Sequence, residues 1–331
     1  MSDVQLICLD SDDLLHPNTG EGNFNESAYF NFFDPARGLG GFARLGNRPN
    51  EGIAEMTLCL YLPDGRVAFM FKRPKIDGND AFDAGGMRFE IRTPMREHGI
   101  RYDGSCIVME RPLDLLDPRA AFTTNPVAKA SVDLGYTAVS TVHGGEPRVR
   151  KNGEWVSANL ERSGQEFAKG HLEQHGRATG TVTVGGETWT VDGFGLRDRS
   201  WGPRFWQAPD HYRWLTMNFG AEAGIAAALT EQRDGRRMTG GYLWEPGVES
   251  RRIRAVEVES EHEPEHGLHT ALRATLTMAD GGTEVVDGRV LRMVPLRNRR
   301  EGVTTRIAEG LTEWRWRDRV GHGWSEFLDH V

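Results

Sequence analysis

The sequence contains few cysteines, and their spacing suggests neither a disulfide framework nor a metal site. Cys8, Cys59 and Cys106 are the three cysteines among 331 residues, and no two of them form a Cys-x-x-Cys pair. An odd number of scattered cysteines disfavours both a disulfide framework and a thiolate zinc site. The fold must therefore depend on an apolar core, which a hydrophobic share of 38% can supply.

The sequence also lacks long apolar runs and any excess of positive charge. No stretch approaches the 18 apolar residues of a membrane-spanning helix, and the acidic opening Met1 to Asp13 has no apolar run of signal length. The net charge is −8 and no basic stripe is visible, which disfavours a nucleic-acid partner. We therefore expect a cytoplasmic protein without integral membrane association, and we leave open whether it forms a homodimer.

The dominant hydrophobic period is two rather than 3.6, which is typical of strands. Apolar residues alternate in Glu55–Leu62, a turn follows at Pro63-Asp64-Gly65, and Arg66–Lys72 returns with the same alternation. Forty glycines and fifteen prolines fit many turns and few long helices. The pattern predicts an all-β protein of antiparallel sheets, each closed on itself or packed as a sandwich.

The length suits two packed halves, which we place at residues 1–150 and 151–331. The segment Gly144–Arg150, with a proline and alternating charge, is the best candidate for a linker between them. Short helices are expected near Asp114–Ala121 and near Thr312–Val320.

The most informative stretch of sequence is a predicted hairpin around Gly185-Gly186. A two-residue loop fixes the register, so that His175 faces Leu196 and Glu173 faces Asp198. Opposed residues point to the same side of a sheet, about 5 Å apart at Cβ. One face of the hairpin therefore collects six polar side chains: His171, Glu173, His175, Arg177, Asp192 and Asp198.

The facing carboxyls of Glu173 and Asp198 are the strongest candidates for catalysis. Two carboxylates at this distance repel unless one holds a proton or a cation lies between them. A carboxyl whose pKa is raised by burial and a like charge is suited to general acid catalysis. The alternatives are that this face is solvated, or that Gly193 and Gly195 form a bulge that breaks the register.

Several residues after the hairpin are candidates for substrate binding or proton transfer. Trp201, Trp206 and Trp214 could line an apolar pocket and shield a developing cation, although tryptophan more commonly packs in a core. Arg199 or Arg204 could anchor a polar end of the substrate. His175, His211 and Tyr212 are candidate secondary proton carriers, with a structural role the commoner fate of a lone histidine.

Three other motifs carry weaker expectations. Asp34 and Arg37 lie in a Pro/Gly-rich segment that could cap a pocket mouth or form a structural ion pair. Asp10-Ser-Asp-Asp13 matches the acid motif of helical terpene cyclases, but an exposed acidic N-terminus fits this chain better. His262, His266 and His269 could bind a metal, although a solvated turn is favoured in so charged a run.

The segment Gly193-Phe-Gly-Leu-Arg-Asp-Arg-Ser-Trp-Gly202 resembles the signature of the carotenoid 1,2-hydratase (hydroxyneurosporene synthase) superfamily. Kievitone hydratase, AttH-like lipocalin-type proteins and fungal decalin-forming Diels–Alderases resemble the same superfamily. Asp198, Trp201 and Gly202 match its Asp-His-x-Trp-Gly pattern, whereas Arg199 stands at the histidine position. The segments Phe32–Arg37 and Glu173–Gly180 look like its uncharacterised soluble branch.

The resemblance implies two lipocalin-like β-barrels with a pocket at or near their junction. It also implies acid–base chemistry on terpenoid or polyketide-like substrates, without a metal or redox cofactor. Arginine keeps its proton at neutral pH, so Arg199 cannot replace a proton-donating histidine. It could instead pair with Asp198 or anchor an anionic or carbonyl group.

The leading hypothesis is a cofactor-independent hydratase or dehydratase, isomerase or cyclase that binds no metal. Its substrate would be an apolar terpenoid, steroid-like or aromatic small molecule, and Asp198 or Glu173 would give or accept the proton. The alternative is a lipocalin-like binder or carrier without turnover. A role as a structural partner would require a large exposed apolar patch, which sequence does not reveal.

Overall fold

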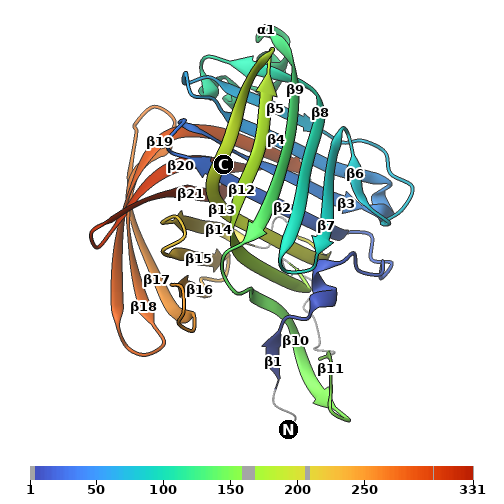
Figure 1. The fold of residues 1–331 in the computed structure, drawn as a ribbon, viewed down its shortest axis with the longest axis vertical. Coiled ribbons are helices and arrows are strands. Elements are labelled where there is room, and N and C mark those ends of the chain that lie inside the picture. The colour runs from blue at the N-terminus through green and yellow to red at the C-terminus, as the bar shows by residue number, and fades with distance from the viewer. Residues whose placement is uncertain (1–3, 159–167, 206–208, 301, 331) are drawn as a thin grey trace.

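The computed structural model describes residues 4–158, 168–205, 209–300 and 302–330. Nearly all of the regular structure is antiparallel strand, arranged as two bodies that lie side by side (Figure 1). The prediction of an all-β protein is confirmed. Among the helices of the described residues, none has the length and apolar character needed to cross a membrane.

The first body is a ring of eight strands that closes through β9. The ring consists of β2 (Phe24–Asp34), β3 (Leu39–Arg48), β4 (Ile53–Tyr61), β5 (Val67–Lys72), β8 (Glu97–Met109), β9 (Val127–Ala138), β12 (Gly170–Val184) and β13 (Glu187–Pro203). Consecutive members pair, and β9 pairs with both β8 and β12. The strands β6 (Phe82–Ala84) and β7 (Met87–Thr93) extend β8, while β1 (Gln5–Ile7), β10 (His143–Lys151) and β11 (Glu154–Ser157) extend β12.

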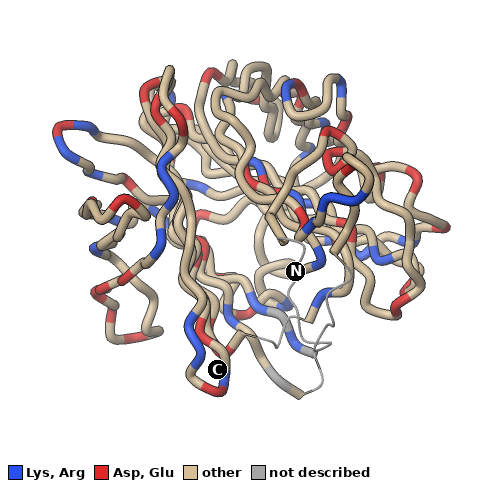
Figure 2. Tube along the Cα trace, turned by 90° about the horizontal axis from the view of Figure 1, so that it is seen from below, with Lys and Arg blue, Asp and Glu red and all other residues tan. Residues whose placement is uncertain are grey.

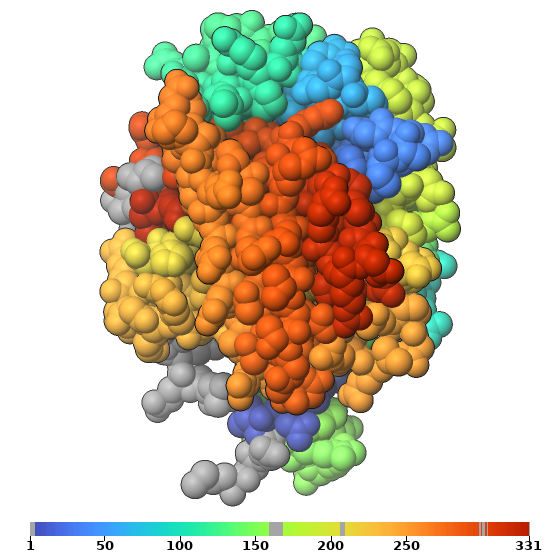
Figure 3. All heavy atoms as spheres, turned by 90° about the vertical axis from the view of Figure 1, so that its left-hand side faces the viewer, coloured from blue at the N-terminus to red at the C-terminus, as the bar shows by residue number. Residues whose placement is uncertain are grey.

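The second body is a closed eight-stranded barrel, in which β14 pairs with β21. Its strands are β14 (Pro209–Asn218), β15 (Gly224–Gln232), β16 (Arg237–Trp244), β17 (Arg251–His262), β18 (His269–Met278), β19 (Thr283–Arg300), β20 (Val303–Trp316) and β21 (Arg319–His330). In Figure 3 the orange-to-red atoms of this barrel form one broad face of the molecule, and blue, teal and yellow-green atoms of the ring are visible along its top and right edges. Acidic and basic residues are mixed over both bodies in Figure 2.

The strand pairing divides the chain later than the sequence pattern indicates. The hairpin β12–β13 belongs to the ring, so the change from ring to barrel falls between Pro203 and Pro209 rather than at residue 150. The expected linker Gly144–Arg150 lies within β10, which pairs with β1, β11 and β12. Its proline and alternating charge suggested a linker, but Gly144 and Gly145 have positive φ angles that only glycine adopts easily, and they allow close contact with β12 and β1.

One predicted helix is present and the other is wrong. The turns η3 (Pro112–Leu116) and α1 (Pro118–Thr124) cover the segment expected to be helical near Asp114–Ala121. The segment near Thr312–Val320 is instead the end of β20 and the start of β21. Cross-strand pairing of its tryptophans in the barrel outweighs the weak helical pattern of so short a segment.

The described residues form four apolar clusters, and alternation along the strands separates the three largest. Phe30 and Phe32 of β2 point into the ring, while Tyr29 and Phe33 point out of it toward the barrel. The barrel has its own interior core, centred on residues such as Trp314. A third core joins the bodies: aromatic residues on the outer face of the ring pack against outward residues of the barrel, namely Val294, Leu311 and Trp324. The ring and barrel therefore share a buried interface.

The acidic N-terminal motif is half buried. Asp12 and Asp13, in η1 (Asp10–Asp13), are 2% and 0% exposed, so the expectation of an exposed motif was wrong for these two residues, whereas Asp10 and Ser11 are exposed. Asp13 pairs with Arg197 at 2.7 Å and with His98 at 2.8 Å. The motif packs against one end of the ring because buried arginines on the inner face of β13 supply the opposite charge.

Candidate active site

The hairpin β12–β13 has the predicted register. Its pairs run without interruption from Gly170–Trp201 to Val184–Glu187, and Glu173 is directly opposite Asp198. The alternative of a bulge at Gly193 and Gly195 is therefore wrong. These glycines instead allow β2 to approach, because a Cβ on Gly195 would lie 1.8 Å from the Asn31 carbonyl oxygen.

A row of polar side chains crosses the outer face of the ring from this pair. Glu173 on β12 pairs with Asp198 on β13, Asp198 pairs with Tyr29 on β2, and Tyr29 pairs with Arg44 on β3. Directly paired residues point to the same side of a sheet. All four side chains therefore face the barrel.

A second row on the barrel faces the first. Trp214 on β14 pairs with Glu326 on β21, and Glu326 pairs with Glu309 on β20. The indole Nε1 of Trp214 donates a hydrogen bond to Glu173 Oε1 over 2.5 Å. The Trp214 ring also meets the Tyr29 ring edge-on at a centroid distance of 5.4 Å. The two rows thus meet at the interface of the two bodies.

Glu173, Asp198 and His171 form a closely coupled group with opposite preferences for the proton. Burial raises the pKa of Glu173, and the charge of Asp198 adds to this effect. Burial also opposes ionisation of Asp198, but the charge and hydrogen bond of His171 outweigh it and lower its pKa. Burial lowers the pKa of His171, but Asp198 reverses this and raises it to about 9. The three shifts thus favour a proton on Glu173 and on His171 over a proton on Asp198.

Part of this group remains accessible although it lies between two packed bodies. The side chain of Asp198 is 16% exposed and that of His171 is 48% exposed, whereas Glu173 is buried. Arg204 lies on the Asp198 side of β13, where it donates to Ser200 Oγ over 3.1 Å. Burial lowers the Arg204 pKa to about 9. A small molecule that reaches Asp198 would therefore meet a cation beside the acids.

His175 lies on the same face but is enclosed. It is 2% exposed, and its Nδ1 lies 2.7 Å from Asn218 Oδ1 of the barrel. Burial lowers the His175 pKa to about 4, so the ring is neutral. This environment favours the structural alternative for His175 over the role of proton carrier.

Trp201 and Arg199 point away from the carboxyl pair, which corrects their expected place in a pocket wall beside it. Both residues lie at odd-numbered positions of β13, whose side chains point toward the interior of the ring. Trp201 stacks on His16 with a centroid distance of 4.2 Å. Arg199 pairs with Glu26 at 2.8 Å, not with Asp198. Period-two alternation accounts for both: odd-numbered residues of β13 face inward while Asp198 faces outward.

The remaining candidates are dispersed. His211 on β14 lies 3.9 Å from Glu231 at the rim of the barrel, on the opposite side of the strand from Trp214. Tyr212 shares the Trp214 side of β14 by alternation. Asp34 is buried, forms an ion pair with Arg37 at 2.8 Å and accepts a hydrogen bond from Asp192 N. These contacts favour the structural ion pair over a role at a pocket mouth. Trp206 lies outside the described residues.

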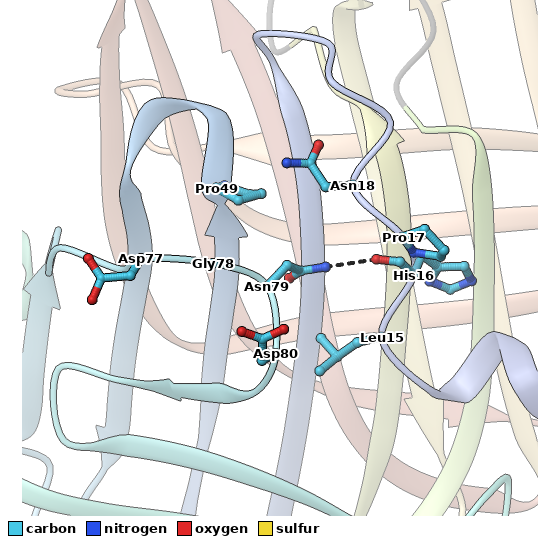
Figure 4. Close-up of a pocket in the computed structure, with 9 residues that line it drawn as sticks. All are labelled: Leu15, His16, Pro17, Asn18, Pro49, Asp77, Gly78, Asn79 and Asp80. Carbon is cyan, nitrogen blue, oxygen red and sulfur yellow. Dashed lines mark hydrogen bonds between the residues drawn. The ribbon is translucent and has the colours of Figure 1, made fainter.

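Two surface pockets lie near the N-terminal segment and contain none of the candidate residues. The larger, of about 570 Å³, is lined by Leu15–Asn18, Pro49 and Asp77–Asp80 (Figure 4). Asn79 closes one side by donating to the His16 carbonyl oxygen. The lining is polar and holds no catalytic pair, so we place the candidate chemistry at the interface.

His171, Glu173 and Asp198 also have the donor atoms of a metal site. Their ligand atoms all lie within 4.8 Å of one another. One imidazole and two carboxylates suit a divalent ion such as Zn²⁺. A metal would displace the protons of His171 and Glu173 when it binds, so its affinity would rise with pH. The same three side chains thus offer either a proton-transfer site or a ligand set for a divalent cation.

The sequence analysis missed four residues of the two rows. Tyr29, Arg44, Glu309 and Glu326 come from distant segments, and only the order of strands brings them together. Glu309 and Glu326 did carry a signal: Glu309 lies within Ile-Ala-Glu-Gly-Leu311, and Glu326 is followed by Phe327 and Leu328, so each acid has apolar neighbours in its strand. An acid among apolar neighbours indicates either that the strand has been aligned with the wrong face inward or that the position has a function.

The family model for a domain of unknown function, DUF7064, matches residues 9–331. The chain belongs to this family. No curated protein matches the DUF7064 chain.

Several solved structures share the fold of this DUF7064 protein. A protein provisionally named AttH from Nitrosomonas europaea has a TM-score of 0.65 at 13% identity, over 99% of this chain and 98% of that one. Kievitone hydratase from Nectria haematococca has a TM-score of 0.56 at 11% identity, over 100% and 96%. CghA in complex with Sch210972 has a TM-score of 0.54 at 12% identity, over 94% and 88%. These likenesses confirm the AttH-like and kievitone-hydratase-like fold; the narrower resemblance to carotenoid 1,2-hydratase stays a prediction.

Proposed function

We propose that this protein is a cofactor-independent acid–base enzyme that acts on a hydrophobic small molecule between the two bodies. The observation that carries the proposal is the Glu173–Asp198 pair, whose pKa values are moved in opposite directions by their surroundings. Pairs of titratable groups separated in this way are how one site holds both an acid and a base at neutral pH. The similarity to kievitone hydratase and CghA supports a hydratase, dehydratase, isomerase or cyclase within this class.

Each group has a defined step in a hydration or dehydration. In dehydration, the protonated Glu173 gives its proton to the leaving hydroxyl, which departs as water, and the Asp198 carboxylate takes a proton from the neighbouring carbon as the double bond forms. Hydration is the reverse. The His171 imidazolium keeps Asp198 ionised between these steps, because it stabilises the carboxylate. The aromatic rings of Trp214 and Tyr29 are neighbours of the pair, and we propose that they stabilise positive charge on carbon.

The interface favours an apolar substrate with a polar end. Aromatic side chains from both bodies form its core, while Arg204 lies on the Asp198 side. We propose a terpenoid, steroid-like or aromatic compound as the substrate class, with Arg204 and Tyr212 as positioning residues.

Isotope incorporation tests this proposal even while the product is unidentified. The protein is incubated in H₂¹⁸O or D₂O with a panel of isoprenoid alkenes, their tertiary alcohols and polycyclic ketones, and masses are measured. A hydratase incorporates ¹⁸O, whereas an isomerase or cyclase incorporates at most deuterium. Glu173→Gln and Asp198→Asn should abolish incorporation, and Asp192→Asn, a matched change on the exposed part of β13, should leave it intact.

The second candidate is a binder or carrier without turnover, which the buried aromatic interface also supports. It predicts that panel members bind with no isotope incorporation, and that Glu173→Gln and Asp198→Asn leave binding unchanged. That combination would contradict the enzyme proposal.

A further inference from the structure

Two glutamates of the barrel occupy positions in the interface where a strand normally carries an apolar residue. Glu309 on β20 and Glu326 on β21 are directly paired and lie on the face that also presents Leu311 and Trp324 to the ring. They are 4% and 8% exposed. A carboxyl at such a position costs free energy unless it is paired or performs a function.

Among the described residues, neither glutamate forms an ion pair, although the charges of Arg204 and Arg44 act on Glu326 without outweighing its burial. Glu309 Oε2 is buried and has no hydrogen-bond partner in the described part of the chain. Burial raises the pKa of each carboxyl to about 8. Both acids therefore hold a proton near neutral pH, and a protonated carboxyl is a hydrogen-bond donor.

The surroundings of the two acids connect them to the Glu173–Asp198 site. Glu326 pairs with Trp214, whose indole is bonded to Glu173, and the charges of Arg204, Asp198 and Arg44 act on Glu326. Tyr29, the partner of Asp198 on β2, feels the charges of both Glu309 and Glu326. The glutamates thus continue the same interface beyond Trp214, away from Glu173.

The chemistry of this subsite favours a neutral oxygen. Protonated carboxyl groups donate hydrogen bonds to a carbonyl or hydroxyl oxygen. The Tyr61 hydroxyl is already used, because it donates to the Glu309 carbonyl oxygen over 3.0 Å and so holds the backbone of β20 at this point. The positive charges of Arg204 and Arg44 act on Glu326 and disfavour a cationic group beside it. A carboxylate would lose its hydration to meet groups without a formal charge.

We propose that Glu309 and Glu326 form a second subsite, which donates hydrogen bonds to a carbonyl or hydroxyl oxygen of the hydrophobic substrate while the Glu173–Asp198 pair acts on another part of it. This inference extends the proposed function to a substrate with an oxygen remote from the reacting carbon. The binding step requires no turnover, so it is tested separately from catalysis.

The test compares two fluorescent probes that differ in one carbonyl group. The first is the naphthyl ketone 6-propionyl-2-dimethylaminonaphthalene, and the second is 2-dimethylaminonaphthalene. Wild-type protein should bind the ketone about tenfold more tightly, the value of a well-formed hydrogen bond. The ketone emission should also show a hydrogen-bonded carbonyl.

Three variants assign the preference to this subsite. Glu326→Leu should abolish the tenfold preference, whereas Glu326→Gln should keep most of it because the carboxamide still donates. Glu309→Gln should behave like Glu326→Gln. The two glutamine variants keep the size and polarity of the side chain, so they remain informative if Glu326→Leu does not fold. Glu313→Gln, on the same strand but paired with surface arginines, is the matched control and should bind both probes as wild type does.

The outcomes separate this inference from the proposed function. Equal affinity of wild type for both probes, no binding of either probe, or an intact preference in Glu326→Leu would each overturn the subsite. A clear preference in a protein that incorporates no isotope from any compound would retain the subsite and reject the enzyme.

Discussion

The protein contains two buried polar clusters that are built on opposite principles. The first, inside the ring, consists of Asp13, Arg197, His98, Arg199 and Glu26. Asp13 lies 2.7 Å from Arg197 and Glu26 lies 2.8 Å from Arg199, so each acid has its own guanidinium. The second lies between ring and barrel, where Glu173, Glu309 and Glu326 are buried with raised pKa values.

The difference lies in how each cluster meets the cost of burial. In the ring cluster, opposite charges and hydrogen bonds compensate for lost hydration, which lowers the pKa of Asp13. In the interface cluster, burial without a paired cation raises the pKa values of the acids instead, so each carboxyl favours its protonated form. The two clusters therefore differ in their charge: the ring cluster consists of ion pairs, and the interface cluster contains acids that favour their neutral form.

The largest expected effect is on stability, from Asp13→Asn. The substitution leaves Arg197 buried without its carboxylate, which costs about 3 to 5 kcal/mol of unfolding free energy. Chemical denaturation at pH 7 measures it. Asp192→Asn breaks an exposed pair with Arg177 and should have little effect. Equal stability of the two variants would show that the ring cluster is not held by paired charge.

The next effect is on the pH dependence of stability, from Glu309→Gln. The folded pKa of Glu309 is about 8, above the ordinary value of 4.5. Glu309 makes its full contribution to the free energy of unfolding below about pH 4.5. That contribution is lost as the pH rises to about 8, because Glu309 loses its proton at a lower pH in the unfolded chain than in the folded protein. The slope is on the order of 1.4 kcal/mol per pH unit.

Glu309→Gln should therefore weaken the decline in unfolding free energy between pH 5 and pH 8, measured by denaturation at several pH values. Asp13→Asn should instead change the stability profile at acidic pH. The lowered pKa of Asp13 stabilises the folded protein at pH values above the pKa of this carboxyl in the unfolded chain, and that stability is lost as the pH falls. Parallel pH profiles for wild type and Glu309→Gln would contradict a raised pKa at Glu309.

A third effect concerns His171 alone. NMR of the histidine side chains should show one imidazole that stays protonated up to about pH 9, because Asp198 stabilises its charge. Asp198→Asn should lower the pKa of that imidazole, and Asp192→Asn should not. A His171 that titrates near pH 6.5 in wild type would remove the basis for an ionised Asp198 partner.

The sequence was sufficient to predict the local geometry of the site. The Gly185-Gly186 turn fixes the hairpin register, so the opposition of Glu173 and Asp198 followed from counting residues. The same counting separates Trp201 and Arg199 from Asp198, since they stand at odd and even positions of one strand. The Asp-x-x-Trp-Gly resemblance placed them in one site, although period-two alternation already puts them on opposite faces.

The partners across the interface could not be predicted in this way. Tyr29, Glu309 and Glu326 reach the site because β2 joins β13, and because β21 closes the barrel beside β14. Those pairings depend on long-range closure, about which alternation within a strand contains no information. The boundary between ring and barrel after Pro203 was missed for the same reason. The amino-acid composition of β12 and β13 does not distinguish strands of the ring from strands of the barrel.

The smallest expected effect compares the two tryptophans, one in each cluster. Trp214 donates its indole N–H to Glu173, and this bond lowers the Glu173 pKa. Trp201 stacks on His16, and its N–H has no hydrogen-bond partner among the described residues. Trp214→Phe should therefore raise the pKa of Glu173, whereas Trp201→Phe should leave it unchanged while weakening the ring. NMR of labelled glutamate carboxyls across a pH titration measures both; an unchanged Glu173 in Trp214→Phe would mean that the indole does not control the proton of the proposed acid.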